Sequence, residues 1–223
     1  IDYCINVQYI HPLTFEVYVG EVALSVDALR AKIRAIEGAP VGVHLVPSGV
    51  GAVDKLLGGL AAPGLVEFSG LAGSGKSSLA LSVVAHFTAD LAQWVAWIDA
   101  GHQLYPPAAC ALGVDLTKLI VVRPQAKRAG WAAEQVVRSG CFSLVVISGV
   151  GVPPRAGIRL ARAAERGRCS ALMLSQTSQR GFPAHQRVHV AEGLLHLVRD
   201  RVGHGKVRTV SAPILPTGID PWR

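Results

Sequence analysis

The sequence predicts an α/β fold in which a mostly parallel sheet lies between helices, with an antiparallel hairpin at one edge. Short apolar runs typical of buried strands alternate with helical segments along most of the chain, and this order favours parallel strands. A glycine-rich loop lies between the first long apolar run and a helix. Near the C-terminal end, two strand-like runs joined through glycines predict the hairpin.

Each element of this fold has a residue pattern that predicts it. Apolar runs without alternation, typical of strands buried on both faces, lie at residues 65–68, 94–99, 119–122, 144–147 and 171–174. Helical patterns lie around residues 131–138 and 157–166, and residues 47–64 contain a short helix before the first core strand. The hairpin strands are residues 193–198 and 206–210.

We divide the chain into three regions: an extension at residues 1–44, a core domain at 45–212 and an irregular, proline-containing tail at 213–223. Ser25 begins an amphipathic helix whose apolar residues recur every three or four positions. This helix packs on the core or docks on a partner. The first 23 residues read as extended, either as a strand offered to a neighbouring subunit or as an artefact of the start site.

Composition narrows the class of protein. Half of the 223 residues are hydrophobic, enough for a sizeable core. No apolar run approaches the ~18 residues of a membrane helix, and no signal-peptide pattern begins the chain, so we expect a cytoplasmic protein without a membrane partner. Four scattered cysteines without C-x-x-C spacing predict reduced core thiols rather than a zinc site or disulfides: Cys4, Cys110, Cys141 and Cys169.

The positive charge is concentrated in the last third of the chain. Residues 151–223 carry twelve Lys and Arg against four Asp and Glu, whereas residues 1–150 carry ten against eleven. A one-sided basic region indicates a polyanion or an acidic protein surface as partner.

The glycine-rich loop matches the phosphate-binding pattern G-x-x-x-x-G-K-[ST] at every fixed position. Its glycines let the backbone turn tightly and present N–H groups to a polyphosphate at a helix N-terminus. Lys76 would reach the terminal phosphates and Ser77 would hold Mg²⁺. The predicted site therefore binds ATP or ADP with Mg²⁺ through Gly70, Gly73, Ser74, Gly75, Lys76, Ser77 and Ser78. The alternative is a glycine-rich turn that only ends a strand.

The order of these segments resembles the ATPase core of the RecA family over residues 45–212. The matching segments are residues 65–70, 97–100 with His102, 112–115 leading to Leu119, 138–140 and 175–176. The resemblance implies a RecA-like P-loop ATPase core. It also implies that Gln176 senses the terminal phosphate, although the residue can equally be read as an ordinary polar strand end.

Two acidic residues that the family uses for hydrolysis are missing. Gly101 stands where RecA-like ATPases place the glutamate that activates water, and Ser148 stands where they place the aspartate that supports Mg²⁺. Tyr105 and Ala108 occupy the positions that contact adenine in RecA. We therefore expect nucleotide binding with weak or absent hydrolysis, and we predict no catalytic residue.

The chain resembles the ImuA family, the RecA-related member of the bacterial DNA-damage mutagenesis cassette, in its small size, its short loop at residues 149–155 and its missing carboxylates. The resemblance implies an accessory role in SOS mutagenesis and translesion synthesis, with RecA, ImuB and an error-prone replicative-type polymerase as partners. Two alternatives stay open: an active DNA-dependent ATPase of the recombinase-paralogue type, and an interaction module with a vestigial phosphate loop.

Two basic segments are candidates for contacts with DNA or a partner protein. Arg155, Arg159, Arg162 and Arg166 fall on one stripe of a helix, with Ile158, Ala161 and Ala164 off that stripe and able to face the sheet. The alternative is that these arginines only form a solvated helix face without a binding role.

The second candidate is residues 179–187, which lie where RecA keeps its main single-strand-binding loop. Here Phe182 lies between Arg180 and Arg187, a combination that suits base stacking with backbone neutralisation. Weak binding of single-stranded DNA follows from this interpretation, and an exposed loop without a ligand is its alternative.

Overall fold

The computed structural model describes residues 42–178, 181–202 and 208–211. The chain divides into two units, Ile1–Val41 and Gly42–Arg223, and all described residues belong to the second. The extended segment and amphipathic helix predicted before residue 41, and the tail predicted at residues 213–223, lie outside the described residues.

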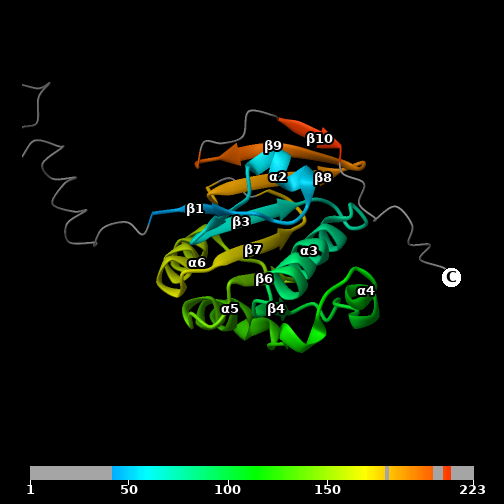
Figure 1. Cartoon of the computed structure of the whole chain (residues 1–223). Coiled ribbons are helices and arrows are strands. Elements are labelled where there is room, and N and C mark those ends of the chain that lie inside the picture. Colours follow the sequence, from blue (N-terminus) through cyan, green and yellow to red (C-terminus); the bar gives the residue numbers. More distant parts are fainter. Residues whose placement is uncertain (1–41, 179–180, 203–207, 212–223) are drawn as a thin grey trace, which may run out of the picture. The chain divides into compact units, whose positions relative to one another are not determined.

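Eight of the described strands form one large sheet, ordered β10-β9-β8-β3-β7-β6-β4-β5 (Figure 1). In chain order they are β3 (Gly64–Ser69), β4 (Val95–Asp99), β5 (Leu119–Val122), β6 (Leu144–Ser148), β7 (Ser170–Ser175), β8 (Gln186–Ala191), β9 (Leu194–Asp200) and β10 (Thr209–Ser211). The strands from β8 to β5 run parallel, and β9 and β10 are antiparallel to their neighbours. The predicted parallel sheet with an antiparallel edge hairpin is confirmed.

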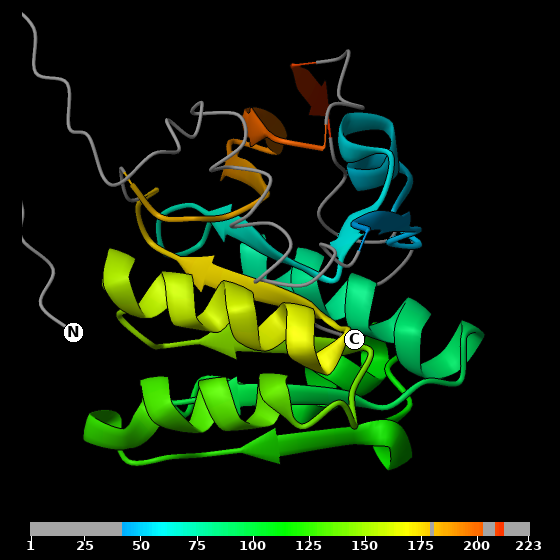
Figure 2. The same cartoon turned by 90° about the vertical axis from the view of Figure 1, so that its left-hand side faces the viewer.

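Helices cover both faces of this sheet. On one face α2 (Gly51–Leu57), α3 (Lys76–Ala85) and α4 (Pro106–Ala111) bury their apolar residues against Phe68 and Val146. On the other face α5 (Ala129–Arg138) and α6 (Pro154–Gly167) pack on Ile147 and Met173, and Figure 2 shows these two helices side by side in front of the sheet. A small antiparallel pair, β1 (His44–Val46) and β2 (Leu60–Ala62), precedes β3.

Strand β8 was not predicted, because residues 179–187 read as a loop. It begins at Gln186 and pairs with β3 on one side and β9 on the other. The buried Gln186 side chain explains why a polar residue can begin a core strand. Its Oε1 accepts from the amide of Ala61 at 2.9 Å, and its Nε2 donates to the carbonyl of Gly59 at 3.0 Å. Both halves of the amide are therefore satisfied.

The prediction for the apolar face of α6 was partly wrong. Leu160, Ala163 and Ala164 are buried, whereas Ile158 is 48% exposed. The helix is rotated so that its small and leucine side chains face the sheet, and Ile158 lies toward the arginine side.

The expectation of core thiols is confirmed for Cys169, which is buried, and is wrong for Cys110 and Cys141, which are exposed. Cys4 lies outside the described residues. Within the described ranges, no helix is long and apolar enough to cross a bilayer.

Substitution by alanine should have opposite effects on stability at two glycines, one on α5 and one on α6. A Cβ at Gly167 would lie 1.9 Å from the carbonyl oxygen of Val137, whereas a Cβ at Gly130 would meet nothing within 4 Å. We expect Gly167→Ala to destabilise the fold by about 1–3 kcal/mol through overpacking. Gly130→Ala should stabilise it by up to about 1 kcal/mol through helix propensity. Urea unfolding of both variants checks this, and shifts of the same sign would contradict the packing described.

Candidate nucleotide-binding site

The glycine-rich loop begins where β3 ends, between β7 and β8. All six residues of β3 are buried, and the amide of Gly70 donates a 3.1 Å hydrogen bond to the carbonyl of Ser175, the last residue of β7. Because the carboxyl ends of parallel strands meet at one edge of a sheet, the loops that follow β4, β6 and β7 lie along the same edge as this loop.

Glycine is required at several positions of the loop. Gly73 and Gly75 have φ angles of 78° and 87°, in the left-handed region that side chains disfavour. A Cβ at Gly70 would lie 2.5 Å from both Ser74 Oγ and the carbonyl of Val190. The sequence therefore folds this stretch into a tight concave turn that a chain with side chains at these positions could not make.

The loop and the first turn of α3 enclose a hollow of ≈ 210 Å³, lined by residues 73–78. The hydroxyl of Ser74 is buried here and finds no hydrogen-bond partner among the described residues. The hydroxyl packs against the backbone of Gly70, where a Cβ would lie 2.5 Å from it, and a buried hydroxyl without a partner is costly. With the N-terminus of α3 at its floor, the hollow fits a phosphate group.

Lys76 lies folded back on the loop. Its Nζ donates to the carbonyl of Leu71 at 3.0 Å, and partial burial lowers the pKa of this ammonium from its usual value. A bound phosphate would act in the opposite direction, because a nearby negative charge favours the protonated amine. Ser77, in the first turn of α3, is exposed, so its hydroxyl is free to ligate a phosphate-bound Mg²⁺.

The two positions that lack family carboxylates have firm structural roles. Gly101 follows β4, and a Cβ at Gly149 would lie 2.5 Å from its backbone nitrogen, so the loops after β4 and β6 touch through their backbones. Ser148 ends β6, where its Oγ accepts from Trp97 Nε1 at 2.9 Å and donates to the carbonyl of Ile98 at 3.2 Å. The Ser148 hydroxyl is therefore committed within the protein.

Asp99 is the carboxylate that ends β4, and it is fully engaged. It is completely buried and accepts from the amides of Gln103 at 2.8 Å and Leu104 at 3.2 Å. The Nε of Arg123 donates to it at 3.2 Å. Asp99 closes the turn after β4 and is not free to act on water. The sequence reasoning missed the contributions of Trp97 and Arg123, which depend on contacts across strands.

Gln176, predicted to sense the terminal phosphate, and the residues at the positions that contact adenine in RecA follow strands that end at this edge. Gln176 follows β7 directly and is exposed, one residue beyond the carbonyl that accepts from Gly70. Tyr105 is the exposed N-cap residue of α4, and Ala108 lies in the first turn of that helix. Gln176 is thus beside the start of the phosphate loop.

The structure corrects the prediction for Phe182 and Arg187. Phe182 is 2% exposed and Arg187 is 6% exposed. Arg187 Nε lies 3.1 Å from Glu67 Oε2 in an ion pair without an aligned hydrogen bond. Its Nη2 donates to the carbonyl of Phe182 at 2.6 Å, and its guanidinium lies 5.7 Å from the centre of the Phe182 ring. Neither side chain is available to stack on a base, and Arg180 lies outside the described residues.

One sequence signal did point to this buried ion pair. Glu67 interrupts an otherwise apolar strand, and a carboxylate buried on β3 requires a partner. Its partner lies 120 positions further along the chain, so spacing could not identify it.

The arginines of α6 form the predicted exposed stripe. Arg155, Arg159, Arg162 and Arg166 all point away from the core, and Arg159 Nε lies 3.3 Å from Glu134 Oε2 on α5. Within the described part of the chain, the other three make no ion pair. Trp131, one turn before Glu134 on α5, is 62% exposed. The surface is thus basic with an aromatic residue beside it.

The model of the RecA N-terminal domain family matches residues 30–207 of this chain. The chain belongs to the RecA N-terminal domain family. Curated RecA relatives agree with this. The chain is 32% identical to Protein RecA of Acholeplasma laidlawii over 171 residues, which cover 75% of this chain and 51% of that protein. It is 36% identical to Protein RecA of Leifsonia xyli subsp. xyli over 177 residues, which cover 77% and 48% respectively.

The chain spans about half the length of these curated relatives. Among solved structures, a KaiC-like protein from Pyrococcus horikoshii superposes with a TM-score of 0.60 at 14% identity, covering 75% of this chain and 94% of that one. At that identity the likeness concerns the fold alone. This RecA-family chain therefore has a RecA-like ATPase fold.

Replacing Lys76 should weaken nucleotide binding without unfolding this RecA-family domain. Lys76→Ala removes a charged donor from the phosphate hollow, and we expect ADP affinity to fall at least about tenfold, since hydrogen bonds to charged groups contribute about 1.5–3 kcal/mol. Lys118→Ala removes a lysine paired with Asp115 at 3.8 Å and serves as control. Calorimetric titration with ADP and Mg²⁺ measures both variants, and an equal effect in the two would contradict the site.

Proposed function

We propose that this RecA-family domain binds ATP or ADP with Mg²⁺ at the phosphate loop, hydrolyses ATP slowly or not at all, and serves as an accessory protein in DNA-damage tolerance. One observation carries the proposal. A complete phosphate loop lies on the same sheet edge as Gly101 and Ser148, and the carboxylate of Asp99, which pairs with Ser148 across the sheet, is fully bonded within the protein.

Binding of the nucleotide is supported by groups that are ready to receive phosphate. Residues 73–78 line the hollow at the N-terminus of α3, and the Ser74 hydroxyl has no partner in the described structure. The Lys76 side chain can turn toward the hollow by releasing its one bond, to the carbonyl of Leu71. Mg²⁺, when bound, neutralises charge on the phosphates, and Ser77 is the residue that would hold it. Each of these interactions favours a polyphosphate.

Hydrolysis requires a group that orients and deprotonates water, and this group is what the site lacks. General-base assistance contributes about 10²–10⁴-fold to such reactions. Gly101 has no side chain, and the Ser148 hydroxyl is held by Trp97 and Ile98. The site therefore favours keeping ATP intact.

The biological role rests on the resemblance to the ImuA family. A domain with RecA shape that holds nucleotide without hydrolysing it suits an adaptor or modulator of RecA, and of an ImuB and error-prone polymerase complex, in SOS mutagenesis and translesion synthesis. At its place in a RecA filament, such a subunit would stop the hydrolytic cycle. The exposed arginines of α6 support contacts with an acidic partner or with DNA.

Restoring the missing carboxylates should restore turnover. The atoms nearest to a Cβ at Gly101 belong to the flexible Gln103 side chain, at 3.4 Å, so the Cβ of Gly101→Glu fits without a backbone change. We expect Gly101→Glu/Ser148→Asp to raise ATP turnover at least about 100-fold over the wild type with single-stranded DNA present. Gly42→Glu, where a Cβ meets nothing within 4 Å, is the control.

Phosphate release measures the rates. Wild-type turnover at recombinase-like rates, stimulated by DNA, would instead support an active DNA-dependent ATPase. No gain in a double variant that unfolds at the same urea concentration as the wild type would show that these two positions do not limit hydrolysis.

The accessory role predicts an effect on RecA itself. We expect substoichiometric amounts of the domain to slow strand exchange by a purified bacterial RecA, because a non-hydrolysing subunit blocks the cycle wherever it joins. Lys76→Ala, which weakens nucleotide binding, should lose most of this inhibition. Unchanged strand exchange with the domain in excess would contradict a role as RecA modulator.

A further inference from the structure

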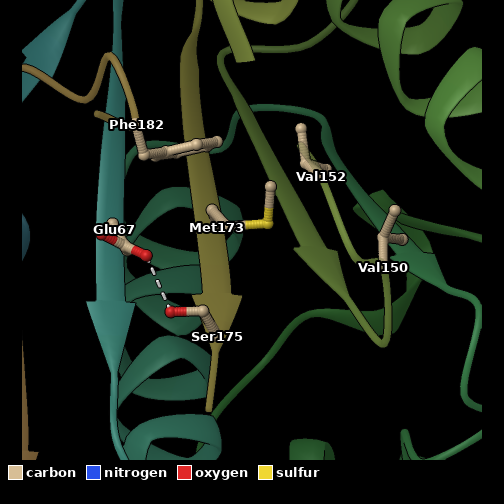
Figure 3. Close-up of a pocket in the computed structure, with 6 residues that line it drawn as sticks. All are labelled: Glu67, Val150, Val152, Met173, Ser175 and Phe182. Atoms are coloured by element: carbon tan, nitrogen blue, oxygen red, sulfur yellow. Dashed lines mark hydrogen bonds between the residues drawn. The ribbon is translucent and has the colours of Figure 1, made fainter. Parts of the chain in front are cut away.

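A single buried carboxylate holds the segment that carries Gln176. Glu67 on β3 is 1% exposed, and its Oε1 accepts from Ser175 Oγ at 2.8 Å (Figure 3). Its Oε2 accepts from Ser178 Oγ at 3.4 Å and lies 3.1 Å from Arg187 Nε. These three partners come from the end of β7, the loop after it and the start of β8, so both ends of this connection meet at one side chain.

The surroundings make each of these donors necessary. Val150, Val152, Met173 and Phe182 line a cavity of ≈ 20 Å³ next to the carboxylate (Figure 3), which is large enough for one water molecule. A buried carboxylate in apolar surroundings needs its lone pairs satisfied by the protein. Arg187 supplies the opposite charge, and Ser175 and Ser178 supply hydroxyl donors.

The two serines lie on either side of Gln176 and Thr177. Ser175 pairs with Ser69 across the sheet, and its carbonyl accepts from the amide of Gly70. Glu67 itself lies three residues before Gly70. The same carboxylate therefore sets the position of the strand that enters the phosphate loop and the position of the turn that presents Gln176.

We propose that Glu67 is a positioning residue for the terminal phosphate: through Ser175 and Ser178 it holds Gln176 at the phosphate loop, and so determines the preference for nucleoside triphosphate over diphosphate. This inference rests on the nucleotide site proposed above. In this proposal Glu67 does not touch the nucleotide and acts through the side chain of Gln176. Arg187 ties the following segment to the same anchor, because its Nη2 donates to the carbonyl of Phe182.

The test removes the two hydroxyls and leaves the ion pair intact. In Ser175→Ala/Ser178→Ala the Glu67–Arg187 pair remains, so the fold keeps its buried charges matched. Affinities for ADP and for a non-hydrolysable ATP analogue are measured by calorimetry with equal Mg²⁺. We expect ADP affinity to stay within about twofold, and the preference for the analogue to disappear, as we also expect for Gln176→Ala.

Further variants make the result specific. Adding Gln176→Ala to the serine variant should change nothing more, because residues that act as one unit are not additive. Ser178→Thr keeps a hydroxyl and should keep the preference, and Ser139→Ala, at the far end of α5, should behave as wild type.

A serine variant that retains the wild-type preference, or one that loses affinity for both nucleotides equally, overturns the positioning role. A wild-type chain that prefers neither nucleotide over the other also overturns it, while leaving the nucleotide site in place. A wild-type chain that binds neither nucleotide overturns the site and this inference together.

Discussion

The enclosure of β3 is the constraint on which the phosphate loop depends. All six residues of the strand are buried, with β7 on one side and β8 on the other, and Glu67 pairs with Arg187 of β8. Breaking such a buried pair by removing one partner typically costs 3–5 kcal/mol. With the strand fixed in this way, Gly70 packs against Ser74 and the carbonyl of Val190, where no Cβ would fit, and the loop amides stay at the N-terminus of α3.

The other strand ends on this edge are satisfied internally, and we propose that this separates nucleotide binding from hydrolysis. The Ser148 hydroxyl is shared between Trp97 and Ile98, and Asp99 is used by Arg123 and two backbone amides. Lys76, by contrast, makes a single exchangeable bond to a loop carbonyl. The groups proposed to bind phosphate are available, whereas the groups at the positions where a RecA-like ATPase handles water and Mg²⁺ are absent or occupied.

Local patterns in the sequence predicted the parallel strands other than β8, together with α5, α6 and the tight turn of the phosphate loop, because each depends on neighbouring residues. Strand β8 and the burial of Phe182 and Arg187 could not be predicted, since the partners are distant in sequence: Gln186 bonds to Ala61 and Gly59, and Arg187 meets Glu67. An arginine beside an aromatic residue is typical of an exposed nucleic-acid loop, and only the position of Glu67 shows that this one faces inward. Ile158 is exposed because of the way α6 is rotated about its own axis, and the spacing of apolar residues along the sequence does not determine that rotation.

The central claim is that the site holds ATP without cleaving it, and the identity of the retained nucleotide tests this most directly. The domain would be incubated with stoichiometric ATP and Mg²⁺ for many minutes, separated from free nucleotide and denatured, and the released nucleotide identified by chromatography. The account predicts that ATP is recovered from the wild type, with little nucleotide recovered from Lys76→Ala. Recovery of ADP and phosphate from the wild type would contradict it.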